Sequence, residues 1–381
     1  MVIIFILAFI IGWYFNIFFQ YRYFWASIHP SQNTNNTDFI SVIVACRNEE
    51  NNILNIIEDV KNQIFDKDRF EMIIVNDHSE DSTLQILEKA AENWQNLKII
   101  CLNESEQGKK KAIKKGISVA KGDIILCTDA DCSAGKNWIK TISDYFADKN
   151  LKLLSAPVEF NKNQGIFQKI QALEFLSLIG SGAAAINRGK SIFCNGANLA
   201  YRKSVFLELN SYDSNSAVSG DDVFLMHHVK RKYSNGIRFA KDRKAIVKTD
   251  AQPNLKSFIN QRKRWTSKSS SYTDLDTIFI SILVLLINVS IVVLSVLSIL
   301  SVITPHESVI LFSTKFLLFI VLFLKYISDY NFLIPVLKFF RRRDLAIWIL
   351  PFEIIYSFYI FFIVIYSFSS KFEWKGRKFR K

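Results

Sequence analysis

Two pairs of carboxylates stand at the borders of apolar segments. Asp129 and Asp131 directly follow the run 123–128. Carboxylates brought together at the end of a buried strand suit a hard divalent cation that is shared with substrate phosphates, and the alternative is a structural loop. Asp221 and Asp222 precede a second apolar run. They could cap a helix, or include a general base that deprotonates a hydroxyl.

Charged side chains also follow other apolar runs. Arg47 and Glu49 come after the first strand-like run and Asp77 after the second, while Lys109 follows Gly108 at the start of a basic segment. A carboxylate at a strand end can accept hydrogen bonds from a nucleobase or a ribose. A Gly-Lys pair that opens a helix offers backbone N–H groups and a cation to phosphate. The alternative for the segment that follows Asp77 is helix capping, and the alternative for the segment that begins at Lys109 is a solvated basic helix face.

Two polar motifs lie further along the chain. Asn195, Gly196 and Asn198 place polar atoms around a tight turn. The run 261–265 reads Gln-Arg-Lys-Arg-Trp. Its guanidinium groups could grip a pyrophosphate, and its indole could stack on a sugar or a base. The alternative for this run is a basic flank with a Trp anchor beside a membrane span.

The elements that must position these residues alternate between strand and helix. Short apolar runs predict strands, and amphipathic or basic segments predict helices. This alternation predicts an α/β domain with a parallel sheet, in which ligands bind beyond the carboxyl ends of the strands. The expected strands are 41–45, 71–75, 97–102 and 123–128, and the expected helices are 50–63, 82–91 and 109–121.

Apolar blocks flank this domain and predict membrane helices, although block 309–327 contains Lys315 and Lys325 and block 345–370 contains Glu353. Residues 1–19 form an uncharged anchor whose cytosolic end is marked by Arg22. Blocks 277–304 and 309–327 predict a helical hairpin, and the basic stretch after them belongs to the cytosol by the positive-inside rule. The last block, 345–370, either spans the membrane or is re-entrant, because one more crossing would place the basic tail outside.

Composition excludes several other classes of protein. Half the residues are hydrophobic and 22% are charged, which excludes intrinsic disorder. The five cysteines include no C-x-x-C pair, so neither a disulfide framework nor a structural zinc site is expected. The net charge is +13. The basic residues lie near the ends of the predicted membrane segments and on one predicted helix, and no nucleic-acid-binding motif accompanies them. Attraction to anionic lipid headgroups accounts for it, and no nucleic-acid partner is expected.

Taken in order, these motifs resemble those of the inverting family 2 glycosyltransferases, which have a GT-A fold, and the similarity covers the whole chain. The matching pieces are S-V-I-V-A-x-R-N-E-E from Ser41, N-D-x-S-x-D-x-T from Asn76, G-K-K-x-A from Gly108, D-A-D from Asp129, G-A-N-L-A-Y from Gly196, G-D-D-x-x-L from Gly220 and Q-R-x-R-W from Gln261.

The resemblance implies a role for each candidate residue. Asp77 contacts the nucleobase, Arg47 and Glu49 line the nucleotide pocket, and Lys109 binds the donor. Asp129 and Asp131 hold Mg²⁺ or Mn²⁺ on the donor diphosphate. Asp222 is the general base with Asp221 beside it, although the family often has Glu-Asp here, which leaves the choice between the two open. The remaining expected contacts are Gln261, Arg262, Arg264 and Trp265 for the donor, and Asn195, Gly196, Asn198 and Trp265 for the acceptor.

The implied enzyme is an integral protein of the cytoplasmic membrane whose catalytic domain faces the cytosol. It transfers a sugar from a nucleoside-diphosphate sugar, expected to be UDP-linked, to the hydroxyl of a membrane lipid or lipid-linked acceptor with inversion. The expected segments are an anchor at 1–25, the GT-A domain at 30–275, a transmembrane hairpin at 276–328, a basic cytosolic segment at 329–344, a transmembrane or re-entrant segment at 345–370 and a basic tail at 371–381.

Two rival interpretations stay open. A processive polysaccharide synthase of the same family shares the Q-x-x-R-W motif, but such enzymes need more helices for an export channel than this chain offers. A non-catalytic, membrane-anchored binding or assembly protein on a decayed transferase domain is the alternative from another class. The intact D-x-D, Asp221-Asp222 and Q-R-x-R-W motifs argue against decay.

Overall fold

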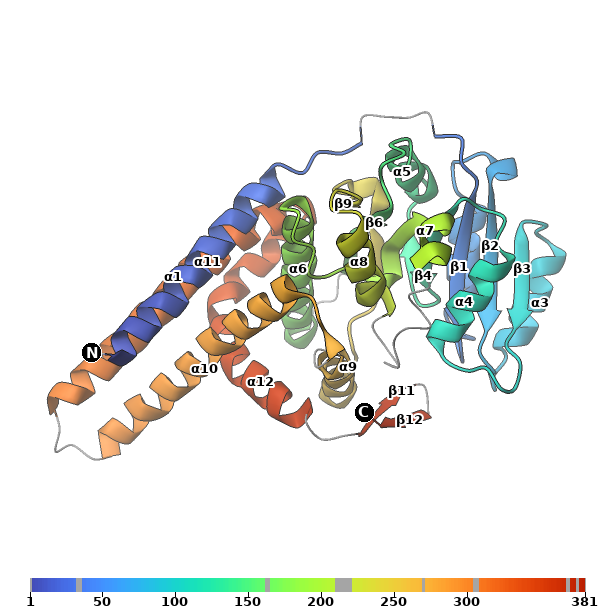
Figure 1. The fold of residues 1–381 in the computed structure, drawn as a ribbon. Coiled ribbons are helices and arrows are strands. Elements are labelled where there is room, and N and C mark those ends of the chain that lie inside the picture. The colour runs from blue at the N-terminus through green and yellow to red at the C-terminus, as the bar shows by residue number, and fades with distance from the viewer. Residues whose placement is uncertain are drawn as a thin grey trace. The chain divides into compact units, whose positions relative to one another are not determined.

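The structure is a computed structural model that forms two compact units (Figure 1). We call them the sheet unit, which is Ile28–Lys162, Ser181–Ala251 and Lys371–Lys381, and the helical unit, which is Met1–Ser27, Asn163–Gly180 and Gln252–Ser370. The structure describes residues 2–31, 36–161, 165–209, 221–268, 271–303, 308–367, 371–374 and 377–380.

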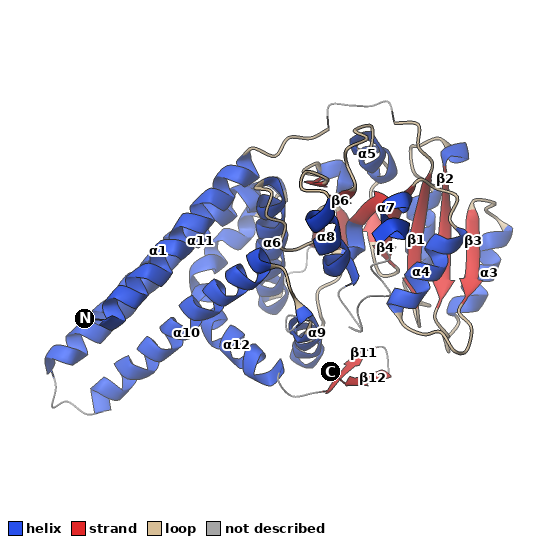
Figure 2. Cartoon of the chain, viewed as in Figure 1, coloured by secondary structure: helices blue, strands red, loops and turns tan. Residues whose placement is uncertain are grey.

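A seven-stranded, mostly parallel sheet organises the sheet unit (Figure 2). Strands β1 to β4 are mutually parallel, and β8 runs antiparallel to both β4 and β6. The predicted α/β class and the four predicted strands are therefore confirmed. The strands in spatial order are β3 (Leu97–Cys101), β2 (Phe70–Asn76), β1 (Ile40–Cys46), β4 (Ile124–Asp129), β8 (Leu199–Arg202), β6 (Leu153–Ser155) and β9 (Ile237–Phe239).

The central strands are apolar on both faces because both faces are covered. Every residue of β2 is buried, and in β1 only Ala45 is partly exposed. Among the covering helices, α2 buries Ile53, Ile56, Ile57 and Val60, which share one helix face by their spacing. The helices of this unit are α2 (Ile53–Lys61), α3 (Thr83–Glu92), α4 (Lys109–Val119), α5 (Trp138–Tyr145), α7 (Lys203–Leu209) and α8 (Asp221–Lys232).

Short elements complete the sheet unit. A three-stranded sheet has the order β5, β10, β7, and a separate hairpin joins β11 and β12. Their bounds are β5 (Ser133–Ala134), β7 (Val158–Phe160), β10 (Val247–Thr249), β11 (Lys371–Trp374), β12 (Arg377–Arg380), η1 (Lys67–Arg69), η2 (Gly196–Asn198) and η3 (Arg243–Ala245).

Long apolar helices make up the helical unit. Among the described residues, five segments are long and apolar enough to cross a membrane by length and composition: Ile4–Ala26, Ile166–Asn187, Leu275–Leu300, Thr314–Phe339 and Arg343–Tyr366. The helices are α1 (Val2–Ala26), α6 (Ile166–Asn187), α9 (Leu255–Ser267), α10 (Leu275–Ile303), α11 (Ser308–Phe339), η5 (Arg343–Trp348) and α12 (Ile349–Ser367). The last turns of α6 belong to the sheet unit.

Helices α1 and α11 lie side by side and run in the same direction (Figure 1). Tyr14 contacts Asp329 near the middle of α1, and Trp25 contacts Phe339 where both helices end. Helix α11 continues to Phe339 rather than ending near residue 327, the end expected from the sequence. Apolar residues after 327, such as Phe332 and Phe339, pack against α1, and the helix extends beyond the predicted block.

Candidate functional site

The loops after β1 and β2 are bound to each other at the carboxyl edge of the sheet. The Arg47 guanidinium donates to the backbone oxygens of Asp77 and His78, and to a Glu80 oxygen at 2.7 Å. The backbone N–H of Glu49 donates to the Thr83 hydroxyl at 2.8 Å. Arg47 and Glu49 are both buried. They therefore shape the predicted nucleotide pocket by fixing its two loops.

Asp77 lies at the centre of this edge, and its side chain is 3% exposed. One oxygen lies 3.0 Å from His78 Nδ1, and the other accepts from the Gly108 backbone N–H at 2.9 Å. Gly108 has φ +96 and ψ 155, a conformation that is essentially restricted to glycine. Asp77 thus joins the end of β2 to the start of α4.

Lys109 continues this connection to the predicted metal pair. Its ammonium group forms an ion pair with Asp129, the last residue of β4. The Asp129 side chain is 35% exposed, and Asp131 is exposed two residues later. The structure therefore places Asp77, Lys109 and Asp129 in one connected cluster at the carboxyl edge of the sheet.

The donor set of this edge fits a hard divalent cation that also binds a substrate diphosphate. Asp129 and Asp131 supply carboxylate oxygens, the ligands that Mg²⁺ prefers. In the described parts of the chain, no group of three His, Cys, Asp or Glu side chains could hold a metal ion, so further oxygens must come from the ligand and water. Burial, followed by the charges of Asp129 and Asp131, raises the pKa of the Cys132 thiol.

Asp222 lies in the first turn of α8 and is held by the turn before β8. One carboxylate oxygen accepts from the Gly196 backbone N–H at 2.9 Å, and the other accepts from Val223 N–H at 2.9 Å. A Cβ at Gly196 would lie 3.3 Å from the Asp222 carboxylate, so a larger residue would crowd this contact. Asp221 opens α8, but its side chain lies outside the described part.

The predicted acceptor residues have local roles. Asn195 accepts from Ala197 N–H at 2.9 Å and so caps η2. Asn198 is fully buried; its side chain binds the Trp138 indole and two backbone oxygens. Because β8 pairs with β4 directly after η2, this turn lies beside the strand that ends in Asp129. Gly196 therefore connects the Asp222 carboxylate to the same edge of the sheet.

The run 261–265 lies on α9 and belongs to the helical unit. Gln261, Arg264 and Trp265 are half-buried. Arg262 is 3% exposed, and its guanidinium binds one oxygen of Glu174 at 2.7 and 3.0 Å. Arg262 thus anchors α9 within the helical unit. The sequence did not predict its partner, Glu174.

Glu174 is the residue of this region that sequence reasoning missed. It projects from α6, and its second oxygen accepts from the Tyr359 hydroxyl of α12 at 3.1 Å. The Arg262 guanidinium carbon lies 4.5 Å from the Phe258 ring centre and 4.3 Å from that of Trp265. A single acid inside an apolar helix was the available signal, since such a residue needs a partner.

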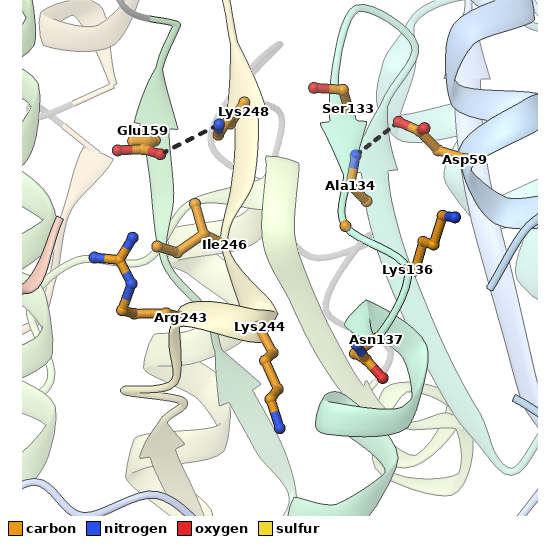
Figure 3. Close-up of a pocket in the computed structure, with 11 residues that line it drawn as sticks. Asp59, Ser133, Ala134, Lys136, Asn137, Glu159, Arg243, Lys244, Ile246 and Lys248 are labelled. Atoms are coloured by element: carbon orange, nitrogen blue, oxygen red, sulfur yellow. Dashed lines mark hydrogen bonds and ion pairs between the residues drawn. The ribbon is translucent and has the colours of Figure 1, made fainter. Parts of the chain in front are cut away.

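A separate pocket of about 420 Å³ opens along the three-stranded sheet (Figure 3). Lys248 lies 3.9 Å from Glu159 on one side, and Asp59 accepts from the Ala134 N–H on the other. Burial raises the pKa of Asp59. The predicted site residues are not among those that line this pocket, so it is distinct from the carboxyl-edge cluster.

Comparison with known proteins shows which family part of the sheet unit resembles. Residues 41–209 match the sequence model of the family described as glycosyl transferase family 2. Glycosyltransferase AglE of Haloferax volcanii is 27% identical over 212 residues, which is 55% of this chain and 66% of AglE. A poly-beta-1,6-N-acetyl-D-glucosamine synthase of Staphylococcus aureus is 26% identical over 243 residues, which is 62% of this chain and 56% of the synthase. The chain therefore spans less than two thirds of the length of either relative.

Among solved structures, the mannosyltransferase PcManGT from Pyrobaculum calidifontis, in complex with GDP-Man and Mn²⁺, aligns with a TM-score of 0.49 at 18% identity. The alignment covers 68% of this chain and 73% of PcManGT.

Proposed function

Because the chain carries a glycosyl transferase family 2 domain with a GT-A-like fold, we propose that it is an inverting glycosyltransferase. Its donor is a nucleoside-diphosphate sugar, in our proposal a UDP-sugar, and its acceptor is the hydroxyl of a membrane lipid or lipid-linked molecule. The observation that carries this proposal is the connected edge Asp77–Gly108–Lys109–Asp129. This edge brings together groups that can bind a nucleobase, a diphosphate and a cation, at the place where ligands bind in α/β sheets.

The donor binds along this edge. The Gly108–Lys109 start of α4 meets the diphosphate with backbone N–H groups and an ammonium charge, and the loops fixed by Arg47 and Asp77 hold the nucleoside. Asp129 and Asp131 are the residues that would hold Mg²⁺ or Mn²⁺. The bound cation supplies charge neutralisation for the leaving diphosphate.

Asp222 is the general base of the proposed reaction. It takes the proton of the acceptor hydroxyl, whose oxygen bonds to the anomeric carbon as the bond from that carbon to the diphosphate breaks. A single displacement inverts the configuration at that carbon. The Gly196 N–H contact, at 2.9 Å from Asp222, orients the carboxylate for this step.

On α9, we assign the donor and acceptor contacts to Gln261, Arg264 and Trp265. The Arg262 guanidinium is already bound to Glu174 inside the helical unit. Arg264 is less buried than Arg262, and we propose it as the arginine of this motif that meets the diphosphate, while Arg262 holds the motif helix in place.

Support for a lipid acceptor comes from the helical unit. Helices α1, α10 and α11 expose large apolar side chains such as Phe9, Phe279 and Phe319 along their length, as expected of helices in a bilayer. We propose that these three cross the cytoplasmic membrane and that the sheet unit faces the cytosol. Helix α6 is also long and apolar, but it is largely buried, so we do not assign it as a membrane span.

Of the two topologies left open by the sequence for residues 345–370, we propose the re-entrant one for helix α12. It follows the basic end of α11 through η5, and Lys263 of α9 lies 4.4 Å from the ring centre of Tyr366 near its other end. Both neighbours belong to the cytosolic side in the proposed topology, so we infer that the tail stays in the cytosol. Labelling of a cysteine at residue 381 by an impermeant reagent from outside intact cells would contradict this.

A donor screen tests the proposed function. Detergent-purified protein with Mn²⁺ or Mg²⁺ is offered a panel of nucleotide sugars, with and without total membrane lipid, and release of the nucleoside diphosphate is followed. We expect release from one donor that requires the cation and rises with lipid. A processive synthase would instead yield a ladder of products. If no donor is turned over and nucleotide binding does not depend on metal, the chain is the non-catalytic binding protein.

A further inference from the structure

The parallel pair α1 and α11 encloses a groove that plays no part in the proposed reaction. Its volume is about 430 Å³, and all of its lining residues belong to the helical unit. They are Phe15, Phe19 and Arg22 of α1, and Tyr326, Ile327, Ser328, Tyr330, Asn331 and Ile334 of α11.

The groove has aromatic walls. Phe15 and Phe19 stack along α1 with ring centres 6.1 Å apart, and Tyr326 and Tyr330 lie 5.6 Å apart along α11. Phe19 is 58% exposed, which leaves a large apolar face toward the groove and its surroundings. Such walls suit a hydrocarbon chain laid between the two helices.

Arg22 stands at one end of the groove and is the one charged side chain among the described residues that line it. Its guanidinium donates to the Asn331 backbone oxygen at 2.8 Å. This bond uses one of five N–H groups and fixes the cation beside the groove. A phosphate is the group that a guanidinium recognises best in this setting.

The length of the groove is close to the hydrocarbon depth of one membrane leaflet. Phe15 and Arg22 are seven positions apart, and Tyr326 and Ile334 are eight positions apart, which at the helical rise is about 10–12 Å. The hydrocarbon of one leaflet is about 15 Å deep, half of the whole core. With Arg22 at the level of the headgroups, the aromatic walls therefore line most of the depth of the leaflet on that side.

We propose that this groove holds a resident anionic phospholipid of the membrane, with its phosphate at Arg22 and an acyl chain between the aromatic walls. The inference uses the proposal that α1 and α11 cross the membrane, but it does not involve the sugar transfer. Its occupant is a structural lipid and not the acceptor.

Photolabelling tests this site. The full chain is reconstituted in phosphatidylcholine vesicles containing one of two probes with the same diazirine acyl chain and either a phosphatidylglycerol or a phosphatidylcholine headgroup. Labelling of the peptide with residues 326–334 is measured by mass spectrometry. We expect about fivefold more labelling by the anionic probe, the preference that one interfacial cation gives.

Variants separate the site from general surface charge. Arg22→Gln should abolish the preference, whereas Arg22→Lys should keep it. Lys338→Gln removes an exposed cation near the end of α11, outside the groove, and should leave the preference unchanged. Equal labelling of the wild type by both probes would overturn the inference, as would equal losses in Arg22→Gln and Lys338→Gln. Crosslinking of the groove to another polypeptide would identify a helix-packing surface instead. None of these outcomes depends on sugar transfer, so failure here and failure of the proposed function are distinguishable.

Discussion

Ionisable side chains behave differently in the two units. At the carboxyl edge of the sheet, Asp129 and Asp131 keep much of their surface open. In the helical unit, Glu174 and Lys325 are almost fully buried. Lys325 binds Asp329 at 2.8 Å and also binds Glu353. The carboxylates at the edge remain accessible to a substrate or a cation, even though Asp129 is paired with Lys109, whereas the buried groups are enclosed together with their partners.

The same contrast appears between two arginines of one motif. Arg262 is enclosed by Glu174, Phe258 and Trp265, while Arg264, two positions further along the helix, is half-buried. Residue type alone does not separate a ligand-binding cation from a structural one. Burial and partners do, because a buried charge that loses its partner is destabilising by several kcal/mol.

The largest expected effect lies at the open edge. Asp222→Asn keeps the shape of the side chain and removes the base, so the transfer rate should fall by about 10²–10⁴-fold. Donor binding should change little, because the amide oxygen can still accept from the Gly196 N–H, although the contact with the Val223 N–H is lost. Steady-state kinetics and nucleotide titration measure the two. A variant with the wild-type rate would remove Asp222 from the mechanism.

Breaking the buried pair should affect stability first. Glu174→Gln leaves the Arg262 guanidinium without a counter-charge, so we expect the free energy of unfolding in detergent to drop by about 3–5 kcal/mol. The double variant Glu174→Gln with Arg262→Gln should recover part of this loss.

Asp329→Asn is the matched control for this pair, because it weakens a comparable buried contact with Lys325 and Tyr14 away from α9. If Glu174 positions the motif helix, the KM for the donor should rise in Glu174→Gln and not in Asp329→Asn. Equal changes in both variants would reduce Glu174 to a general stabilising residue.

A smaller effect is expected at the start of α4. Gly108 has φ +96, and a Cβ there would meet open space, so Gly108→Ala introduces backbone strain without a clash. The strain is of order 1–3 kcal/mol and should loosen the N–H contact with Asp77. We expect weaker nucleotide binding with unchanged secondary structure, measured by titration calorimetry and circular dichroism. Gly135→Ala, at an exposed glycine with open space and no positive φ, is the control.

The smallest effect concerns the thiol beside the metal pair. Burial, then the charges of Asp129 and Asp131, raises the pKa of Cys132. A raised pKa keeps the thiol protonated as pH increases, and alkylation requires the thiolate. Iodoacetamide should therefore not modify Cys132 between about pH 7 and pH 9, while the exposed Cys101 reacts. Modification of Cys132 at the rate of Cys101 would show that the D-x-D segment is open to solvent.

Much of the sheet unit could be predicted from the sequence because its signals are local. The runs 41–45 and 71–75 are continuous and apolar, as strands buried on both faces must be, and polar residues at their ends predicted where ligands bind. Asp77 and Asp129 were found in this way. The sequence could not predict that Arg47 binds the loop after β2, or that the buried Asn198 side chain binds the Trp138 indole and two backbone oxygens. In both cases the partners are distant in the sequence.

The helical unit was less predictable for a related reason. Hydropathy located α1, α10, α11 and α12, but it missed the long apolar helix α6 and did not identify the partners of the helices. Helix α11 continues past residue 327 because its apolar residues pack on α1, and Glu174 was overlooked because its partner Arg262 is 88 positions away. An acid in an apolar helix indicates that a partner exists, but only the tertiary fold identifies it.

The most direct test of the central claim is to follow the sugar itself. Protein reconstituted in vesicles of total membrane lipid is incubated with Mn²⁺ and the radiolabelled donor found in the screen, and the label that enters the organic phase is separated by chromatography. We predict one glycolipid that carries a single sugar and is absent with Asp222→Asn. A ladder of products, or release of nucleoside diphosphate without any labelled lipid, would contradict transfer to a membrane lipid.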